Sequence, residues 1–259
     1  MDVTTSALPD WLSACAARFT QGAQDTDVRR VPLEWQGRRI GSVHPALWPD
    51  VAPHWSQGAD PVATLQALAQ HLRGLGRTGP WRDEAVSVRD ADGQVVGAIE
   101  RGVARVLGIA TEAVHLVGLA PDGRVWLQQR AFDKANDPGL WDTLMGGMVA
   151  HGESLDDTLA RETWEEAGLR LADLRGLRWG QPFRMHKPME DGGGLGQLVE
   201  TLHWCVATLP DGLVPDNQDG EVAGFECVAP DEAARRVLAG ACTDEAAWVL
   251  ALALGWPVR

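Results

Sequence analysis

The chain has 259 residues, 45% of them hydrophobic, which is enough apolar surface for one large domain or two modest ones with buried cores. Its formal net charge of −13, with no basic run, argues against non-specific binding to nucleic acid. No segment is apolar over the length that crosses a bilayer, and residues 1–20 lack the basic start and apolar run of a secretory signal. We therefore expect neither a membrane protein nor a secreted one.

The cysteines support an intracellular location. There are four, Cys15, Cys205, Cys227 and Cys242, and no two have the C-x-x-C spacing of a metal or redox motif. We expect them to be reduced thiols in a cytoplasmic protein, and we expect no disulfide or zinc site.

Residues 1–110 are predicted to form a small α+β domain. Apolar residues at helical spacing, strand alternation and glycine turns predict its elements. They are a helix over 9–20, a hairpin around Gln36-Gly37, a helix over 61–75, a hairpin around Asp92-Gly93 and a short helix over 101–107. Nothing in this region offers a catalytic constellation.

Residues 111–259 are predicted to form a second domain. A hairpin around Pro121-Asp122-Gly123 leads into a loop over 132–147 and then a charged helix. Further strands are expected near 177–185, 198–208 and 222–229, with 189–196 as a flexible hairpin loop, followed by helices over 231–239 and 243–255. Strands mixed with helices before and after them favour a layered α/β sandwich.

The charged helix lies within residues 147–169 and has clear ends. Ser154 is suited to cap its start, with Asp157 three residues later, and Gly168 is suited to end it. Inside it, residues three and four apart share a face, so the carboxylates of Glu162, Glu165 and Glu166 lie together.

Three carboxylates on one face repel one another, and a cation must offset that repulsion. A hard divalent ion such as Mg²⁺ prefers oxygen ligands and keeps part of its coordination for substrate phosphates. Arg161 lies beside this face and could hold a carboxylate by a bidentate contact. The alternative is a solvated helix with an i, i+4 pair between Arg161 and Glu165. The functional interpretation is favoured because seven residues fall in register: Gly147, Glu153, Arg161, Glu162, Glu165, Glu166 and Gly168.

This stretch resembles the Nudix box, G-x5-E-x7-R-E-U-x-E-E-x-G-U with U a bulky aliphatic residue, and departs from it only at Thr163. The resemblance implies an α/β/α sandwich with a mixed sheet that hydrolyses nucleoside diphosphates linked to another moiety and related organic diphosphates. Carried over by position, Glu162, Glu165 and Glu166 would bind Mg²⁺, or Mn²⁺ in its place. Arg161 would orient Glu162.

The remaining motif residues have expected places as well. Gly147 would begin the loop that approaches metal and phosphate, and Glu153 would reach the metals through water. Glu165, Glu166 and Arg161 are thus candidate catalytic residues.

Four residues outside the box are candidate site residues. Arg130, Lys134 and Asp142 lie near the expected mouth of the site and are candidates for substrate binding, although a surface loop explains each of them equally well. Glu221 precedes a predicted strand, where Nudix enzymes often place an extra carboxylate. It could bind a metal or act as general base, or it could be a solvated acid in a turn.

Residues 99–225 resemble a narrower Nudix group that carries an extra N-terminal domain and is found fused to thiamine pyrophosphokinase in some fungi. That resemblance implies hydrolysis of thiamine diphosphate or damaged analogues such as oxythiamine diphosphate to the monophosphate and phosphate. Gly224 departs from the group, since many members carry an acid there. The partner expected is this small diphosphate, and the sequence also allows a homodimer.

Three other functions stay open. One is hydrolysis of ADP-ribose or a nucleotide sugar. Isopentenyl diphosphate isomerases share the fold and a layout like that of Lys134, Pro138, Gly139 and Trp141, but they need a cysteine near Gly146-Gly147, and this chain has none there. A non-catalytic sensor that binds a diphosphate is the third, and the intact box favours an enzyme over it.

Overall fold

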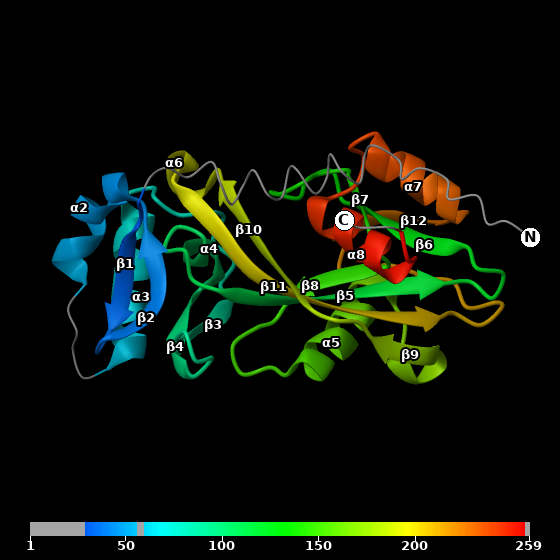
Figure 1. Cartoon of the computed structure of the whole chain (residues 1–259), viewed down its shortest axis with the longest axis horizontal. Coiled ribbons are helices and arrows are strands. Elements are labelled where there is room, and N and C mark those ends of the chain that lie inside the picture. The colour runs from blue at the N-terminus through cyan, green and yellow to red at the C-terminus, as the bar shows by residue number, and fades with distance from the viewer. Residues whose placement is uncertain (1–28, 56–59, 257–259) are drawn as a thin grey trace, which may run out of the picture.

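The fold is seen in a computed structural model that describes residues 29–55 and 60–256 (Figure 1). The helix predicted over 9–20 and Cys15 lie outside these ranges. Within them, no helix combines the length and the apolar character needed to cross a bilayer. The second half of the chain forms one large sheet with helices, and the described first half gathers at one end of it (Figure 1).

The N-terminal elements follow the predicted order. They are β1 (Val31–Trp35), β2 (Arg38–Val43), α2 (Trp48–Val51), α3 (Pro61–Gly74), β3 (Ala85–Arg89), β4 (Val95–Glu100) and α4 (Arg101–Ala104), with 3-10 turns at Pro45–Leu47 and Ala52–His54. Both predicted hairpins are confirmed, since β1 pairs with β2 and β3 with β4, each antiparallel. The helix predicted over 101–107 is shorter than expected. It ends at Ala104, and residues 105–108 form turns up to Gly108, which takes a left-handed φ of 51°.

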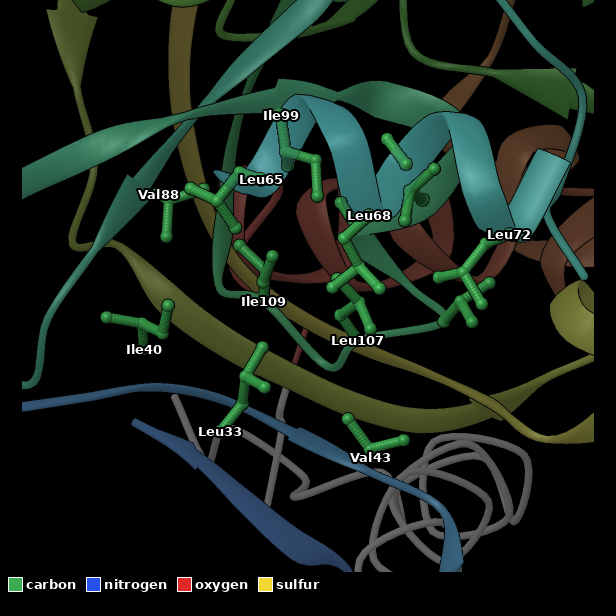
Figure 2. Packing of buried hydrophobic residues seen from close by; sticks show 14 of the residues in the cluster. Leu33, Ile40, Val43, Leu65, Leu68, Leu72, Val88, Ile99, Leu107 and Ile109 are labelled. Atoms are coloured by element: carbon green, nitrogen blue, oxygen red, sulfur yellow. The ribbon is translucent and has the colours of Figure 1, made fainter. Parts of the chain in front are cut away.

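Helix α3 organises a core among these elements. Asp60 caps it, since Asp60 Oδ1 accepts a hydrogen bond from Val62 N at 2.9 Å. Leu65, Leu68 and Leu72 recur at helical spacing and are fully buried, each contributing about 1.5–3 kcal/mol. They lie against the two hairpins in one cluster (Figure 2).

The second half of the chain forms a mixed sheet. Its elements are β5 (Thr111–Leu119), β6 (Val125–Arg130), β7 (Trp141–Asp142), β8 (Met145–Met148), α5 (Leu155–Ala167), β9 (Arg175–Trp179), β10 (Phe183–Met189), α6 (Asp191–Gly194), β11 (Gly196–Thr208), β12 (Val222–Val228), α7 (Pro230–Leu238) and α8 (Asp244–Ala253), with a 3-10 turn at Leu171–Asp173. The strand order is β10-β11-β5-β6-β12, with β8 on β5, β7 on β6 and β9 on β11. The β11–β5 pairing is parallel and the others are antiparallel.

Helices cover both faces of this sheet. Helix α5 lies on one face, and α7 and α8 lie on the other (Figure 1). Leu116 packs with Leu159 of α5, whereas its neighbour Val117 packs with Leu250 of α8. Successive side chains of a strand point to opposite faces, so β5 serves both cores. The predicted α/β/α sandwich is confirmed.

The single strand predicted near 177–185 is wrong in detail, because it is two strands. Trp179 at the end of β9 pairs with Cys205, whereas Phe183 at the start of β10 pairs with Leu202. Between them, Pro182 has no N–H to donate to a ladder. Short strands β7 and β8 were also missed within the predicted loop over 132–147, where Pro138-Gly139 and Gly146-Gly147 obscure strand alternation.

The hairpin predicted around 189–196 is confirmed, and it makes a contact that the sequence did not reveal. Gly192, Gly193 and Gly194 all have positive φ, which accounts for three consecutive glycines. The β10–β11 hairpin extends to the N-terminal elements (Figure 1). There Leu195 packs on their core, and Arg30 Nη1 donates to Leu195 O at 3.0 Å.

Candidate active site

The helix that carries the candidate site begins and ends as predicted. At its start, Ser154 Oγ accepts from Asp157 N at 3.1 Å, while Asp157 Oδ2 accepts from Ser154 N at 3.2 Å, which completes a capping box. At its end, Gly168 takes a φ of 64°, and a Cβ there would collide with Asp216 O. The chain after Gly168 also returns to the helix, since Gln218 N donates to Glu165 O at 2.9 Å.

Arg161 holds three carboxylates of the motif. Its Nε and Nη2 donate to the two oxygens of Glu153, each at 2.8 Å. Its Nη1 donates to Glu162 Oε1 at 2.9 Å and to Glu165 Oε2 at 3.0 Å. The bidentate contact predicted for Arg161 is therefore made with Glu153, whereas Glu162 receives a single hydrogen bond.

Glu153 is held by Arg161 through both of its carboxylate oxygens. The hydrogen bonds from Arg161 lower the pKa of Glu153 to about 2, and Thr158 Oγ1 donates a further hydrogen bond at 2.7 Å. Glu153 therefore stays ionised throughout the physiological pH range, fixed to the helix that it precedes.

Replacing Glu153 with Gln is expected to lower the free energy of unfolding by about 1 kcal/mol at pH 7, the order expected for a partly exposed ion pair. The folded pKa, about 2, lies below the ordinary value of 4.5, so the stabilisation is present above pH 4.5 and is lost as the pH falls from 4.5 towards 2. Urea unfolding of the wild type and the variant at pH 7, 4 and 3 should show a difference in the free energy of unfolding that becomes smaller as the pH falls. If the exposed, charge-matched variant Glu190→Gln loses as much free energy of unfolding with the same pH dependence, the stabilisation is not due to the Glu153–Arg161 ion pair.

Glu166 is the most deeply buried of the three helix glutamates, with 2% of the residue exposed. Its Oε2 accepts from Gln128 Nε2 at 2.9 Å and from Gly146 N at 3.0 Å. Burial, and then the charge of Glu162, raise the pKa of Glu166 to about 8. Without a cation the carboxyl group is largely protonated at neutral pH, and a bound cation would displace that proton.

Glu162 lies against the glycine loop. A Cβ at Gly147 would collide with the Glu162 carboxylate, so only glycine leaves room for that side chain. Burial raises the pKa of Glu162 to about 7 against the opposing effect of Arg161. Glu165, by contrast, has 41% of its side chain exposed.

Lys134 and Glu221 meet at this face. Lys134 Nζ forms a close ion pair with Glu221 Oε2 and lies 3.9 Å from Glu166 Oε1. Burial raises the pKa of Glu221, but the hydrogen bond and charge of Lys134 outweigh it, so the pKa is lowered overall and the group is ionised. Lys134, expected to bind substrate, thus lies between two carboxylates.

Arg130 and Asp142, the other candidates for substrate binding, face each other. Arg130 Nη1 lies 3.5 Å from Asp142 Oδ2, and Asp142 is 3% exposed. Asp142 also accepts from Thr143 N at 2.8 Å and lies 3.7 Å from His115 Nδ1. Asp142 is therefore held within a polar network.

A cavity of about 100 Å³ opens beside the glycine loop. Of the predicted residues, Arg130, Asp142 and Gly147 line it. Two larger hollows, of about 510 and 440 Å³, share no residue with the glutamate face and lie around Trp81 and Pro210. The smaller cavity is the relevant one, because it adjoins the groups with perturbed pKa values.

Sequence reasoning missed several polar residues at this site. The cavity is also lined by Arg101, Arg105, His115, Glu200 and Glu245, and Gln128 contacts Glu166. The only available signal was that Arg101 and Arg105 are four residues apart in a predicted helix and so share a side of it.

The donor atoms at the helix face suit a hard divalent cation. As arranged here, the side chains of residues 29–55 and 60–256 include no group of three His, Cys, Asp or Glu ready to hold a metal, because Arg161 and Lys134 engage the carboxylates. Gln128 Oε1 is buried beside Glu166 and has no hydrogen-bond partner within the described chain. The carboxylate oxygens of Glu162, Glu165 and Glu166 suit Mg²⁺ or Mn²⁺ once Glu162 and Glu165 turn from Arg161.

The mixed sheet between helices, with a glutamate-bearing helix against a glycine loop, is the arrangement of the Nudix fold class. A family model described as the NUDIX domain matches residues 110–248, more than half of the chain, and the chain belongs to the Nudix family. Enzymes of this family hydrolyse phosphorus anhydrides and generally use divalent cations.

Individual relatives agree with this membership. Nudix hydrolase 20, chloroplastic, of Arabidopsis thaliana is 30% identical over 177 residues, which cover 65% of this chain and 46% of that protein. An isopentenyl-diphosphate Delta-isomerase of Mycolicibacterium vanbaalenii is 33% identical over 93 residues, covering 36% of this chain and 51% of the isomerase. This chain spans about half the length of the curated relatives it matches, 46% and 47% for two Arabidopsis proteins.

The solved structure of DR0079 from Deinococcus radiodurans superposes with a TM-score of 0.51 at 23% identity, covering 64% of this chain and 97% of that one. At this identity the likeness shows the fold alone.

Proposed function

We propose that the protein is a Mg²⁺-dependent hydrolase of a small organic diphosphate. The observation that carries the proposal is the buried carboxylate of Glu166, hydrogen-bonded to Gly146 N and Gln128, beside Glu162 and next to the cavity. Such a group is costly to bury ionised unless a cation partners it. Glu162, Glu165 and Glu166 would hold that cation.

The residues divide the chemistry between them. Bound Mg²⁺ would neutralise the diphosphate and stabilise the charge that develops on its phosphoryl oxygens. Gly146 N fixes the Glu166 carboxylate, and Arg161 would hold Glu162 and Glu165 on the same helix face until the cation replaces it as their partner. Ionised Glu221 would accept a proton from the attacking water.

The substrate we propose is thiamine diphosphate or a damaged analogue such as oxythiamine diphosphate. Asp137, Glu200 and Glu245 line the cavity on which the glycine loop opens. The same cavity is lined by Arg101 and Arg105, which we assign to the diphosphate. We assign the carboxylates to an organic group that is cationic or rich in N–H donors, as a thiazolium and an aminopyrimidine are. ADP-ribose, whose adenosine is neutral, gains less from them and is the second candidate.

The test is hydrolysis with Mg²⁺ of thiamine diphosphate, oxythiamine diphosphate, ADP-ribose and nucleoside di- and triphosphates at equal concentration, followed by chromatography of the monophosphate products. We expect the highest kcat/KM for the thiamine-type compounds, and turnover about 10²- to 10³-fold lower in Glu166→Gln. A preference for ADP-ribose or nucleotides would discard the thiamine assignment and keep the hydrolase. No hydrolysis of any compound would favour a sensor. Isopentenyl diphosphate is incubated separately, and its conversion to the allylic isomer, followed by NMR, would favour an isomerase.

A further inference from the structure

Arg101 lies at the junction between the N-terminal elements and the Nudix fold (α4 in Figure 1). Its Nη1 donates to Glu84 Oε2 at 2.7 Å, and its backbone N donates to Glu84 O at 2.8 Å. Burial lowers its pKa, but the carboxylates of Glu84, Glu162 and Glu200 raise it overall. The N-terminal elements thus fix a permanent positive charge within electrostatic range of the glutamate helix.

Arg105 lies one helical turn later and is less constrained. Within the described chain, its side chain makes an ion pair with Asp191 at 3.8 Å and no hydrogen bond. Its backbone is held firmly, since Arg105 O accepts from Gln197 N at 2.8 Å. A long ion pair leaves the donors of the guanidinium available to a better-matched acceptor.

Both arginines line the cavity beside the site. They share its wall with Gly147 and Met148, and the same two arginines with Met148 also line a second, smaller hollow of about 30 Å³. Arg82 joins them in that hollow. Three guanidinium groups and one carboxylate, that of Asp191, therefore line this smaller hollow, in a chain whose formal net charge is −13.

A purely structural role explains part of this arrangement. Arg101 joins α4 to β3 through Glu84, and that pair needs no ligand. Arg105 has no comparable partner among the described residues, because its ion pair with Asp191 is beyond hydrogen-bond distance. A guanidinium presents paired donors that match phosphate oxygens, which the carboxylates that also line the cavity cannot do.

We propose that Arg105, assisted by Arg101, binds the substrate phosphate that lies away from the glutamate helix, so that the N-terminal elements form part of the substrate site. The proposal rests on the proposed function in taking the ligand to be a diphosphate. It assigns those elements a direct contribution to affinity, separate from the metal chemistry of the Nudix box.

The test is calorimetric binding of inorganic pyrophosphate with Mg²⁺ to the full chain. Arg105→Met is expected to raise the Kd about 10- to 100-fold, the loss of a charge-assisted contact. The Kd of Arg105→Lys should lie between those of the wild type and Arg105→Met, because a single point charge replaces the paired donors of the guanidinium. Arg235→Met removes the same charge from an exposed site on α7 and should bind as the wild type does.

Unchanged affinity in Arg105→Met, or an equal loss in Arg235→Met, would overturn the proposal, as would absence of binding to the wild type at millimolar pyrophosphate. If Arg105→Met does not fold, Arg105→Lys decides the question by the same comparison. Hydrolysis of the substrate panel is measured separately. If no compound of the panel is hydrolysed but Arg105→Met still raises the Kd for pyrophosphate, the proposed function alone is refuted. If a compound is hydrolysed but the Kd of Arg105→Met is unchanged, this inference alone is refuted.

Discussion

Replacing Glu166 with glutamine is expected to lower turnover about 10²- to 10³-fold, the usual loss when one preorganised electrostatic partner is removed. Both hydrogen bonds that reach this side chain, from Gln128 Nε2 and Gly146 N, go to Oε2. The carbonyl oxygen of a glutamine can accept them equally well. The substitution therefore removes the charge while preserving the packing.

A second readout separates metal binding from folding. A ligand that binds only the folded state raises the melting temperature. Mg²⁺ should therefore raise the Tm of the wild type more than that of Glu166→Gln, while the two Tm values without metal stay close. The exposed variant Glu190→Gln serves as the charge-matched control and should keep wild-type turnover and the full response to Mg²⁺. Near-normal turnover in Glu166→Gln would refute the role proposed for Glu166.

Local sequence signals predicted the elements near the site well. Ser154, Asp157 and Gly168 fixed the ends of α5 because capping depends on residues close in sequence. The hairpin between β5 and β6 likewise followed from a turn of three residues. Strand β9 was not separated from β10, because its end depends on pairing with β11, which lies some 25 residues further on.

The candidate site was predictable only where its members share a helix. The spacing of Glu162, Glu165 and Glu166 places them on one face whatever the tertiary structure. That Arg161 would contact Glu153 bidentately, or that Arg105 would face the cavity, depends on how separate segments pack. Such contacts leave no periodic signal in a single sequence.

Replacing Gly147 with alanine is the second change with a large expected effect. The added Cβ would overlap the carboxylate and Cγ of Glu162, and the backbone on either side of Gly147 is held by strand β8 pairing with β5. Glu162 must therefore move away from the loop. Displacement of a catalytic group by about 1 Å can lower the rate about 10²-fold. Because Glu162 is a proposed metal ligand, we expect kcat to fall by about that factor.

The matched control is Gly224→Ala, which adds the same methyl group to a strand of the same sheet where no atom lies within 4 Å of the new Cβ. It should leave kcat and Tm close to the wild type. Gly147→Ala should remain folded, because the Glu162 side chain is flexible and can rotate away from the new methyl group. We therefore expect the variant to lose activity with a near-normal Tm. If Gly147→Ala retains full kcat, the close packing of Glu162 on the loop has no part in catalysis. If it loses Tm in step with kcat, the glycine serves the fold, and the proposed placement of Glu162 beside the metal loses its support.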